Sequence, residues 1–209
     1  MAFEWHEYMK MFIGLVVILN PMLALPVFIS LTETMGDGER LSNARRTSLA
    51  VAVVLTVAAL LGEEILALFG ISIDSFRVGG GLLILLMAIS MMHARMSGAQ
   101  HTDKEHEEAQ LRADVAVVPL AIPLLAGPGA ISTAIIYAHR DAGWMHAVLI
   151  GEIWVAALLV WLTLRSALPI SRALGTTGLN IATRLMGLLL AAIAAEFIVN
   201  GLKGMWFGH

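Results

Sequence analysis

Two clusters of helix-breaking residues lie inside apolar stretches of this chain, Asn20-Pro21 and Gly127-Pro128-Gly129. Proline lacks the backbone N–H that an α-helix uses, and its ring clashes with the carbonyl four residues earlier. Where a helix stops and restarts, the new N-terminus offers free N–H groups with partial positive charge, and the old C-terminus offers carbonyls with partial negative charge. Such a pair of ends suits a zwitterion, with its carboxylate on the N–H groups and its ammonium on the carbonyls.

Residues around the two clusters extend this candidate binding site. The Asn20 amide can both donate and accept hydrogen bonds, and the hydroxyls of Ser132 and Thr133 could cap the restarted helix or contact a ligand. Small neighbours leave little side-chain bulk, which predicts a small solute. A packing kink satisfied by a neighbouring helix is the alternative explanation for each break. The candidate substrate-binding residues are Asn20, Pro21, Ala24, Pro26, Ala126, Gly127, Pro128, Gly129, Ser132 and Thr133.

The composition places these breaks in a membrane. Of the 209 residues, 58% are hydrophobic and 14% are charged, with mean hydropathy +0.82, whereas an average soluble domain is about 25% charged. Inside hydrocarbon, non-helical backbone persists only where protein buries it or where it lines a wet cavity. The net charge of −3 gives no basic surface for nucleic acid. Since there is no cysteine, disulfides and thiol chemistry are excluded.

The apolar runs predict an all-α integral membrane protein with a single transmembrane domain over residues 1–209. At about 20 residues per span, the chain holds six helices, and the first and fourth are the broken ones. The N-terminus is acidic and aromatic rather than basic, so we expect no cleaved signal peptide. The expected spans are residues 9–31, 44–69, 76–92, 115–137, 145–164 and 181–202, with one hydrophilic loop over 93–114.

The six expected helices divide into two similar halves, about 9–92 and about 115–203. Each half opens with a broken helix and ends with a helix that carries Arg and Gly three residues apart. An odd number of spans per repeat forces the two halves into opposite orientations, which is the inverted-repeat plan of many secondary transporters; chance similarity between apolar helices is the alternative. The matched positions are Arg77 and Gly80 with Arg184 and Gly187, and Phe69-Gly70 with Leu174-Gly175.

Positive charge is distributed unequally between the two sides of the expected bundle. Of the 13 Lys and Arg residues, all but Lys10, Arg77, Arg140 and Lys203 fall on the side of the first, third and fifth connections. Loops on the cytoplasmic side carry the excess of Lys and Arg. Both termini are therefore expected on the side opposite the cytoplasm.

Ionisable residues within membrane spans are functional candidates by default. Glu152 and Glu196 have no partner nearby in sequence, and either could carry a coupling proton. An equal alternative is that each carboxyl makes a structural hydrogen bond, to Asn200, Arg165 or a backbone group. Arg184 could also pair with one of the two. Asp74 and Arg77 could be an ion pair three residues apart at a helix start.

The hydrophilic loop over 93–114 supports a rival hypothesis. It combines histidines with carboxylates, which could bind a divalent metal, although a solvated loop explains the same residues. No span carries a dense set of such ligands, so no intramembrane metal site or cofactor is expected. No catalytic motif is present either, which argues against an enzyme. The loop residues concerned are His93, His101, Asp103, Glu105, His106, Glu107 and Glu108.

Four segments resemble a known family in order and spacing: LNPMLALPVFISLT, FGISIDSFRVGGGLLIL, PLAIPLLAGPGAIST and RLMGLLLAAIAAEFIVNGLKG. They are similar to the MarC family of bacterial inner-membrane proteins, also called the small neutral amino acid transporter (SnatA) family, and within it to YchE-like members. This family is placed with the LysE-type transporters. The resemblance implies a 3+3 inverted repeat in the cell inner membrane.

The resemblance also implies export or exchange of small neutral amino acids such as glycine and alanine, with protons as the suspected coupling ion. A divalent-cation exporter is the runner-up, and a non-transporting membrane scaffold is the third interpretation. Direction of flux and oligomeric state stay open. The family motif positions in this sequence are Asn20, Pro21, Pro26, Gly127, Pro128, Gly129 and Ser132.

Overall fold

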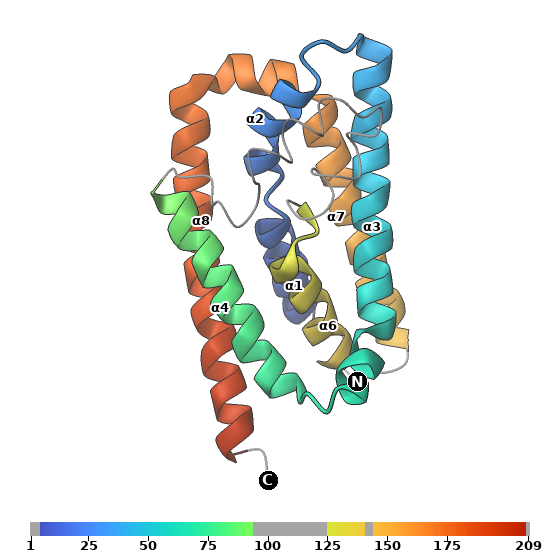
Figure 1. Ribbon diagram of the computed structural model, residues 1–209, viewed down its shortest axis with the longest axis vertical. Coiled ribbons are helices and arrows are strands. Elements are labelled where there is room, and N and C mark those ends of the chain that lie inside the picture. The colour runs from blue at the N-terminus through green and yellow to red at the C-terminus, as the bar shows by residue number, and fades with distance from the viewer. Residues whose placement is uncertain (1–4, 94–124, 141–143, 208–209) are drawn as a thin grey trace.

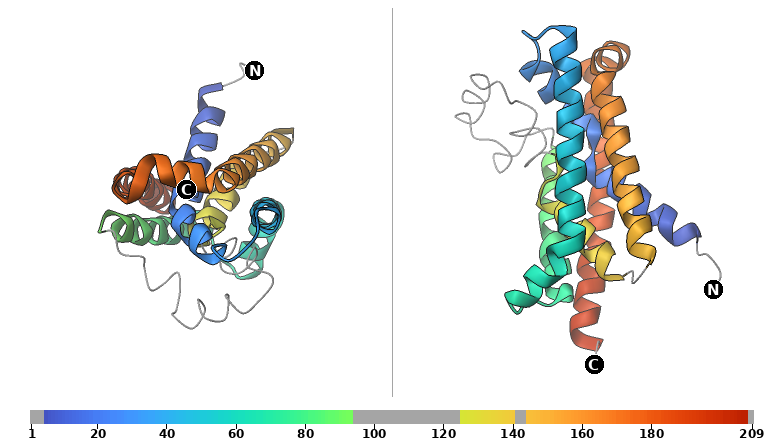
Figure 2. Two further views of the ribbon diagram at one scale, coloured as in Figure 1. Left: turned by 90° about the horizontal axis from the view of Figure 1, so that it is seen from above. Right: turned by 90° about the vertical axis from the view of Figure 1, so that its right-hand side faces the viewer.

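The computed structural model describes residues 5–93, 125–140 and 144–207, and every regular element in these ranges is a helix. The helices form a bundle in which α6 lies between the others, while the N-terminal part of α1 slants outward from it (Figure 1, Figure 2). They are α1 (Trp5–Leu19), α2 (Pro21–Leu31), α3 (Asp37–Leu68), α4 (Ile73–Met92), α6 (Pro128–Arg140), α7 (Trp144–Arg165) and α8 (Ala167–Phe207).

Five helical segments among the described residues are long and apolar enough to cross a bilayer. The broken pair α1–α2 forms one candidate over His6–Leu31, and the others fall in α3, α4, α7 and α8. An integral multi-pass membrane protein is therefore confirmed. The expected fourth span, 115–137, is covered only in its second half, because α6 has 13 residues and residues 115–124 lie outside the described part of the chain.

The first span is broken where the sequence predicts, but only once. Asn20 separates α1 from α2, and it is the one described non-glycine residue with a positive φ, at 43°. Pro26 does not interrupt the backbone further, because α2 continues through it to Leu31. The Pro26 ring faces outward, and one missing N–H bends or weakens a helix without ending it.

Helices α4 and α8 lie side by side and antiparallel (Figure 1). A Cβ built on Gly81 would lie 3.0 Å from the Ala194 carbonyl oxygen, and one on Gly187 would lie 3.1 Å from that of Ala88. Glycines therefore let the two backbones approach closely, as small residues do between membrane helices. Gly79 has open space around it instead and faces away from the bundle.

Helix α8 contains a sharp turn at Gly175, where φ is 61° and ψ is −179°. The part before the turn lies across one end of the bundle, and the part after it runs the length of the bundle (Figure 1, Figure 2). The connection expected between the fifth and sixth spans is thus helical. Gly70, the glycine matched to Gly175 by sequence, has a φ of 66°, so both matched glycines adopt a conformation that other residues rarely take.

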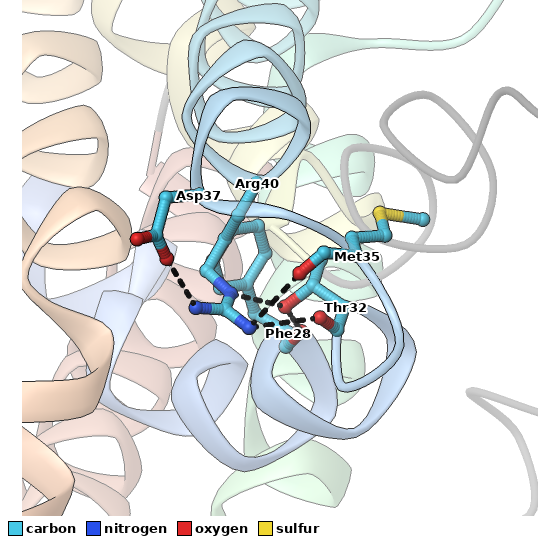
Figure 3. A network of polar contacts seen from close by, with 5 residues as sticks. All are labelled: Phe28, Thr32, Met35, Asp37 and Arg40. Carbon is cyan, nitrogen blue, oxygen red and sulfur yellow. Dashed lines mark hydrogen bonds and ion pairs between the residues drawn. The ribbon is translucent and has the colours of Figure 1, made fainter.

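Arg40 closes the end of α2 and the turn into α3 (Figure 3). Its guanidinium donates to the carbonyl oxygen of Thr32 at 3.1 Å and to that of Met35 at 3.4 Å, and it pairs with Asp37 at 3.3 Å. The Thr32 hydroxyl, fully buried, donates to the Phe28 carbonyl at 2.7 Å. A cation among the last carbonyls of a helix satisfies them and favours the helix dipole.

Replacing Arg40 with glutamine should lower the stability of the protein, while the structure at the two helix breaks should stay unchanged. Because the side chain is mostly buried, at 19% exposed, we expect a loss of about 1.5–3 kcal/mol, the usual range for hydrogen bonds to a charged group. Thermal unfolding in detergent measures the loss. Arg40→Lys keeps the positive charge but loses the several N–H donors of the guanidinium. Its unfolding temperature should therefore lie between those of wild type and Arg40→Gln. Equal unfolding temperatures for Arg40→Gln and wild type would contradict this role.

Candidate functional site

The first break presents a buried amide at the junction of α1 and α2. Asn20 is 3% exposed, and its backbone N–H still donates to the Val16 carbonyl, which completes the last turn of α1. Its Nδ2 lies 3.4 Å from the Met91 sulfur, while no described residue bonds its Oδ1. Since Pro21 has no N–H, the Val17 carbonyl also lacks its usual helical donor. A carbonyl and an amide oxygen are thus left available at this break.

The second break lies at the start of α6. Gly127 is buried and non-helical, and its carbonyl accepts the first bond of α6 from the Ile131 N–H at 3.0 Å. Leu125 and Ala126, just before it, are also buried. The helix therefore begins inside the protein, and its first N–H groups lack helical partners, as at every helix N-terminus.

Both breaks pack against the same stretch of α4. Met91 contacts the Asn20 amide. A Cβ built on Gly129 would lie 2.9 Å from Ile84 Cγ1 and 3.8 Å from Cγ2 of Ile18, two residues before Asn20. The two discontinuities, more than 100 residues apart in sequence, therefore lie close together in the bundle core.

The other predicted binding residues divide by burial. Ser132 and Thr133 are buried, but neither caps α6: the Thr133 hydroxyl donates to the Gly129 carbonyl within the helix at 2.8 Å. Ser132 packs against the backbone of Gly80 on α4. Ala24 and Ala126 are fully buried, Pro21 is half-buried, and the rings of Pro26 and Pro128 are exposed.

A cavity of about 870 Å³ lies between α1, α4, α6 and α8. Its lining on α1 precedes the first break, and its lining on α6 follows the second. The lining on α1 runs from Glu7 to Val17, about 15 Å along that helix at 1.5 Å per residue. The Lys10 side chain lines the cavity in the N-terminal half of α1 and is 74% exposed, so the cavity is open to the surface there. At the inner end, Val17 lies three residues before Asn20. The cavity thus reaches within about one helical turn of the first break.

Comparison with known proteins gives the chain its family. Residues 5–206 match the model of MarC family integral membrane proteins. This chain belongs to the MarC family. The UPF0056 membrane protein YhcE of Escherichia coli (strain K12) is 41% identical over 208 residues, which cover 99% of this chain and 96% of that protein. The resemblance seen in the four sequence segments is therefore confirmed.

Two further MarC relatives come from other organisms. The UPF0056 membrane protein YvbG of Bacillus subtilis (strain 168) is 40% identical over 199 residues and covers 93% of each chain. The UPF0056 membrane protein MJ1677 of Methanocaldococcus jannaschii is 41% identical over 189 residues, covering 90% of this chain and 91% of that one. These names specify a membrane protein and no substrate. No solved structure matches this chain.

Of the five ionisable candidates in this MarC chain, two line the cavity. Arg77 on α4 and Glu196 on α8 both face it. Asp74 pairs with Arg77 at 3.1 Å, as the spacing predicts. Glu152 is partly buried on α7, and Arg184 is exposed on α8; neither lines the cavity.

Sequence reasoning missed Tyr137 among the polar cavity residues, and it named Asn200 only as a possible hydrogen-bond partner of Glu152 or Glu196. Tyr137 lines the cavity near the end of α6, and its ring meets Phe197 edge-on at 6.2 Å between centroids. A Cβ built on Gly14 would lie 2.7 Å from the Tyr137 hydroxyl oxygen, so this glycine leaves room for that group between α1 and α6. Asn200, one turn after Glu196, completes the wall on α8. The position of Asn200 four residues after an intramembrane Glu was the available signal.

The metal hypothesis falls mainly outside the described residues. His101 and His106 lie in the undescribed range 94–124. His93, at the end of α4, places its Nδ1 2.8 Å from the Ile89 carbonyl oxygen. Across the described ranges, no group of three His, Asp or Glu side chains is arranged to hold a metal ion.

Proposed function

We propose that this MarC protein is a secondary transporter, an exporter or exchanger, of small neutral amino acids such as alanine and glycine. The supporting observation is that two buried helix breaks meet the same segment of α4. One break offers the unpaired Asn20 amide oxygen and the other the first N–H groups of α6. A zwitterion needs these two kinds of partner at once: acceptors for its ammonium and donors for its carboxylate.

The cavity then serves as an open route to a binding site that is closed in this conformation. Gly129, Ile18 and Ile84 are in contact at the level of the breaks, which leaves the substrate to enter as α6 separates from α4. Lys10, Arg77, Glu7 and Glu196 give the route both signs of charge, which matches a zwitterion better than a simple ion. Protons are the proposed coupling ion, with Glu196 and Glu152 as the candidate carriers.

Two observations agree with an inverted repeat. The third helices of the two halves, α4 and α8, pack antiparallel through Gly81 and Gly187. Gly70 and Gly175, which precede these helices, both have positive φ. On this plan the halves move against one another around the two breaks. The location proposed is the bacterial inner membrane, with both termini periplasmic by the distribution of Lys and Arg.

Counterflow of labelled alanine in proteoliposomes tests the proposal. With unlabelled alanine or glycine inside, labelled alanine should accumulate transiently, because an exchanger couples the two movements. In a panel of unlabelled amino acids added outside, small neutral ones should reduce the uptake of labelled alanine most and larger neutral ones less. Glutamate and lysine, which carry a net charge, should not reduce it.

Two outcomes would reject the amino-acid assignment. Counterflow equal to that of empty liposomes for every amino acid in the panel would favour a scaffold. Flux of a divalent cation that is lost when His101 and His106 are replaced by alanine would favour the cation exporter instead.

A further inference from the structure

A second recess lies on the outer face of the bundle, away from the breaks and the cavity. It has a volume of about 290 Å³ and runs between α3 and α7. We call it the α3–α7 groove. Its walls are Arg45, Ser48, Leu49 and Ala52 on α3 and Trp154, Ala157, Leu158 and Trp161 on α7.

The groove faces the lipid along most of its length. Leu49, Trp154 and Leu158 are 42%, 46% and 51% exposed, respectively. Residues 45–52 and 154–161 each cover about 10 Å along their helix axes. The recess is therefore a slot parallel to the helices, with the length and the apolar lining of part of an acyl chain.

Arg45 marks one end of the groove at the level of the lipid headgroups. Helix α3 has 32 residues, about 48 Å, which exceeds the hydrocarbon thickness of about 30 Å. No charged residue occurs in α3 between Arg46 and Glu63, a distance of about 25 Å. Arg45 thus lies where the hydrocarbon region ends, and it pairs with no carboxylate among the described residues.

A second arginine and a hydrogen-bond donor lie at the same end. The Arg165 guanidinium lies 5.1 Å from the centre of the Trp161 ring, a cation–π contact that holds the guanidinium beside the groove. The Trp161 indole N–H is enclosed and has no acceptor in the described part of the chain. That N–H is enclosed by protein, so the groove offers a lipid two cations above an apolar slot, which match a headgroup phosphate above an acyl chain.

We propose that the α3–α7 groove binds an anionic phospholipid. The phosphate lies between Arg45 and Arg165, and an acyl chain follows Leu49, Trp154 and Leu158 into the bilayer. A zwitterionic lipid fits less well, because its own cation competes with the two arginines. This site is independent of the transport proposal, since none of its residues lines the cavity or the breaks.

Brominated lipids test the site, because bromine quenches tryptophan fluorescence at contact. The protein is the full chain with Trp5, Trp144 and Trp206 replaced by phenylalanine, so that Trp154 and Trp161 report alone. It is reconstituted in phosphatidylcholine vesicles with increasing dibromo-phosphatidylglycerol or dibromo-phosphatidylcholine. We expect half-maximal quenching at a several-fold lower mole fraction of the anionic lipid. Free glycerol phosphate should not shift that curve, since the acyl chain is part of the ligand.

Matched variants distinguish a specific lipid-binding site from general attraction of anionic lipid to a basic surface. Arg45→Gln should bring the two quenching curves together, and Arg45→Lys should keep them apart. Arg172→Gln removes an exposed charge outside the groove and should leave the selectivity intact. Native mass spectrometry of the unmodified chain provides a second measurement, in which phosphatidylglycerol should be retained over phosphatidylcholine. Identical curves for both lipids, or no quenching by either because protein covers the groove, would overturn the proposal.

Discussion

Leucine in place of Gly129 should stop alanine counterflow. The position is buried where α6 meets α4, and even a Cβ there would lie 2.9 Å from Ile84 Cγ1 and 3.5 Å from the Met87 sulfur. A leucine side chain therefore fills the space that the proposed substrate requires and forces α6 outward. Overpacking costs about 1–3 kcal/mol, which as a barrier corresponds to a rate about five- to 150-fold lower.

Two controls separate blocked transport from failed folding. Gly79→Leu adds the same side chain to α4 at a site with nothing within 4 Å, so transport and stability should stay at the wild-type level. Gly129→Ala should slow counterflow more mildly, and Ile84→Ala in the same chain should restore part of the rate by removing the opposing Cγ1. A Gly129→Leu protein that elutes as a folded species and transports normally would contradict a substrate site at this break.

Glycine in place of Asn20 should abolish counterflow while the protein stays folded. Asn20 adopts a left-handed conformation, with φ 43° and ψ 65°, and glycine adopts it without strain. The change therefore keeps the break and removes only the amide. If that amide bonds a charged substrate group, its loss costs about 1.5–3 kcal/mol, or an affinity about ten- to hundredfold weaker.

Alanine at the same position gives the comparison. Asn20→Ala also removes the amide, but relative to glycine its Cβ costs about 1–2 kcal/mol in the left-handed region, which asparagine tolerates better through its short polar side chain. Both variants should lose counterflow, while only Asn20→Ala should unfold at a clearly lower temperature. If Asn20→Gly transported alanine at the wild-type rate, the amide would have a structural role alone, satisfied by its contact with Met91.

The sequence located the broken backbone well because the causes of a break are local. Asn20-Pro21 interrupts the first span where expected, and Gly127 precedes a helix that starts inside the protein. Gly70 and Gly175, matched by sequence similarity, share a positive φ. Glycine and proline act on their own turn of chain, so a single sequence suffices to find them. Pro26 is the exception, since the helix absorbs it without a break.

The composition of the cavity was much harder to anticipate. Arg77 and Glu196 were singled out because charge is rare in a span, yet nothing in sequence placed them in one cavity with Tyr137. Their proximity depends on how α4 and α8 rotate against each other, which is set by glycine contacts between residues more than 90 positions apart. Tyr137 likewise depends on the space left by Gly14. Such long-range contacts leave no local pattern.

The break at Asn20 also bears on how the protein is made. The segment that contains it, His6–Leu31, is synthesised before the helices that pack on it, and the free backbone groups at the break have no water to bond within the bilayer. The residues that cover it, such as Met91 on α4 and Gly129 on α6, are synthesised tens of residues later. The first segment thus enters the membrane before the residues that cover its break have been made. Its native conformation can form only after the second half of the chain has been inserted.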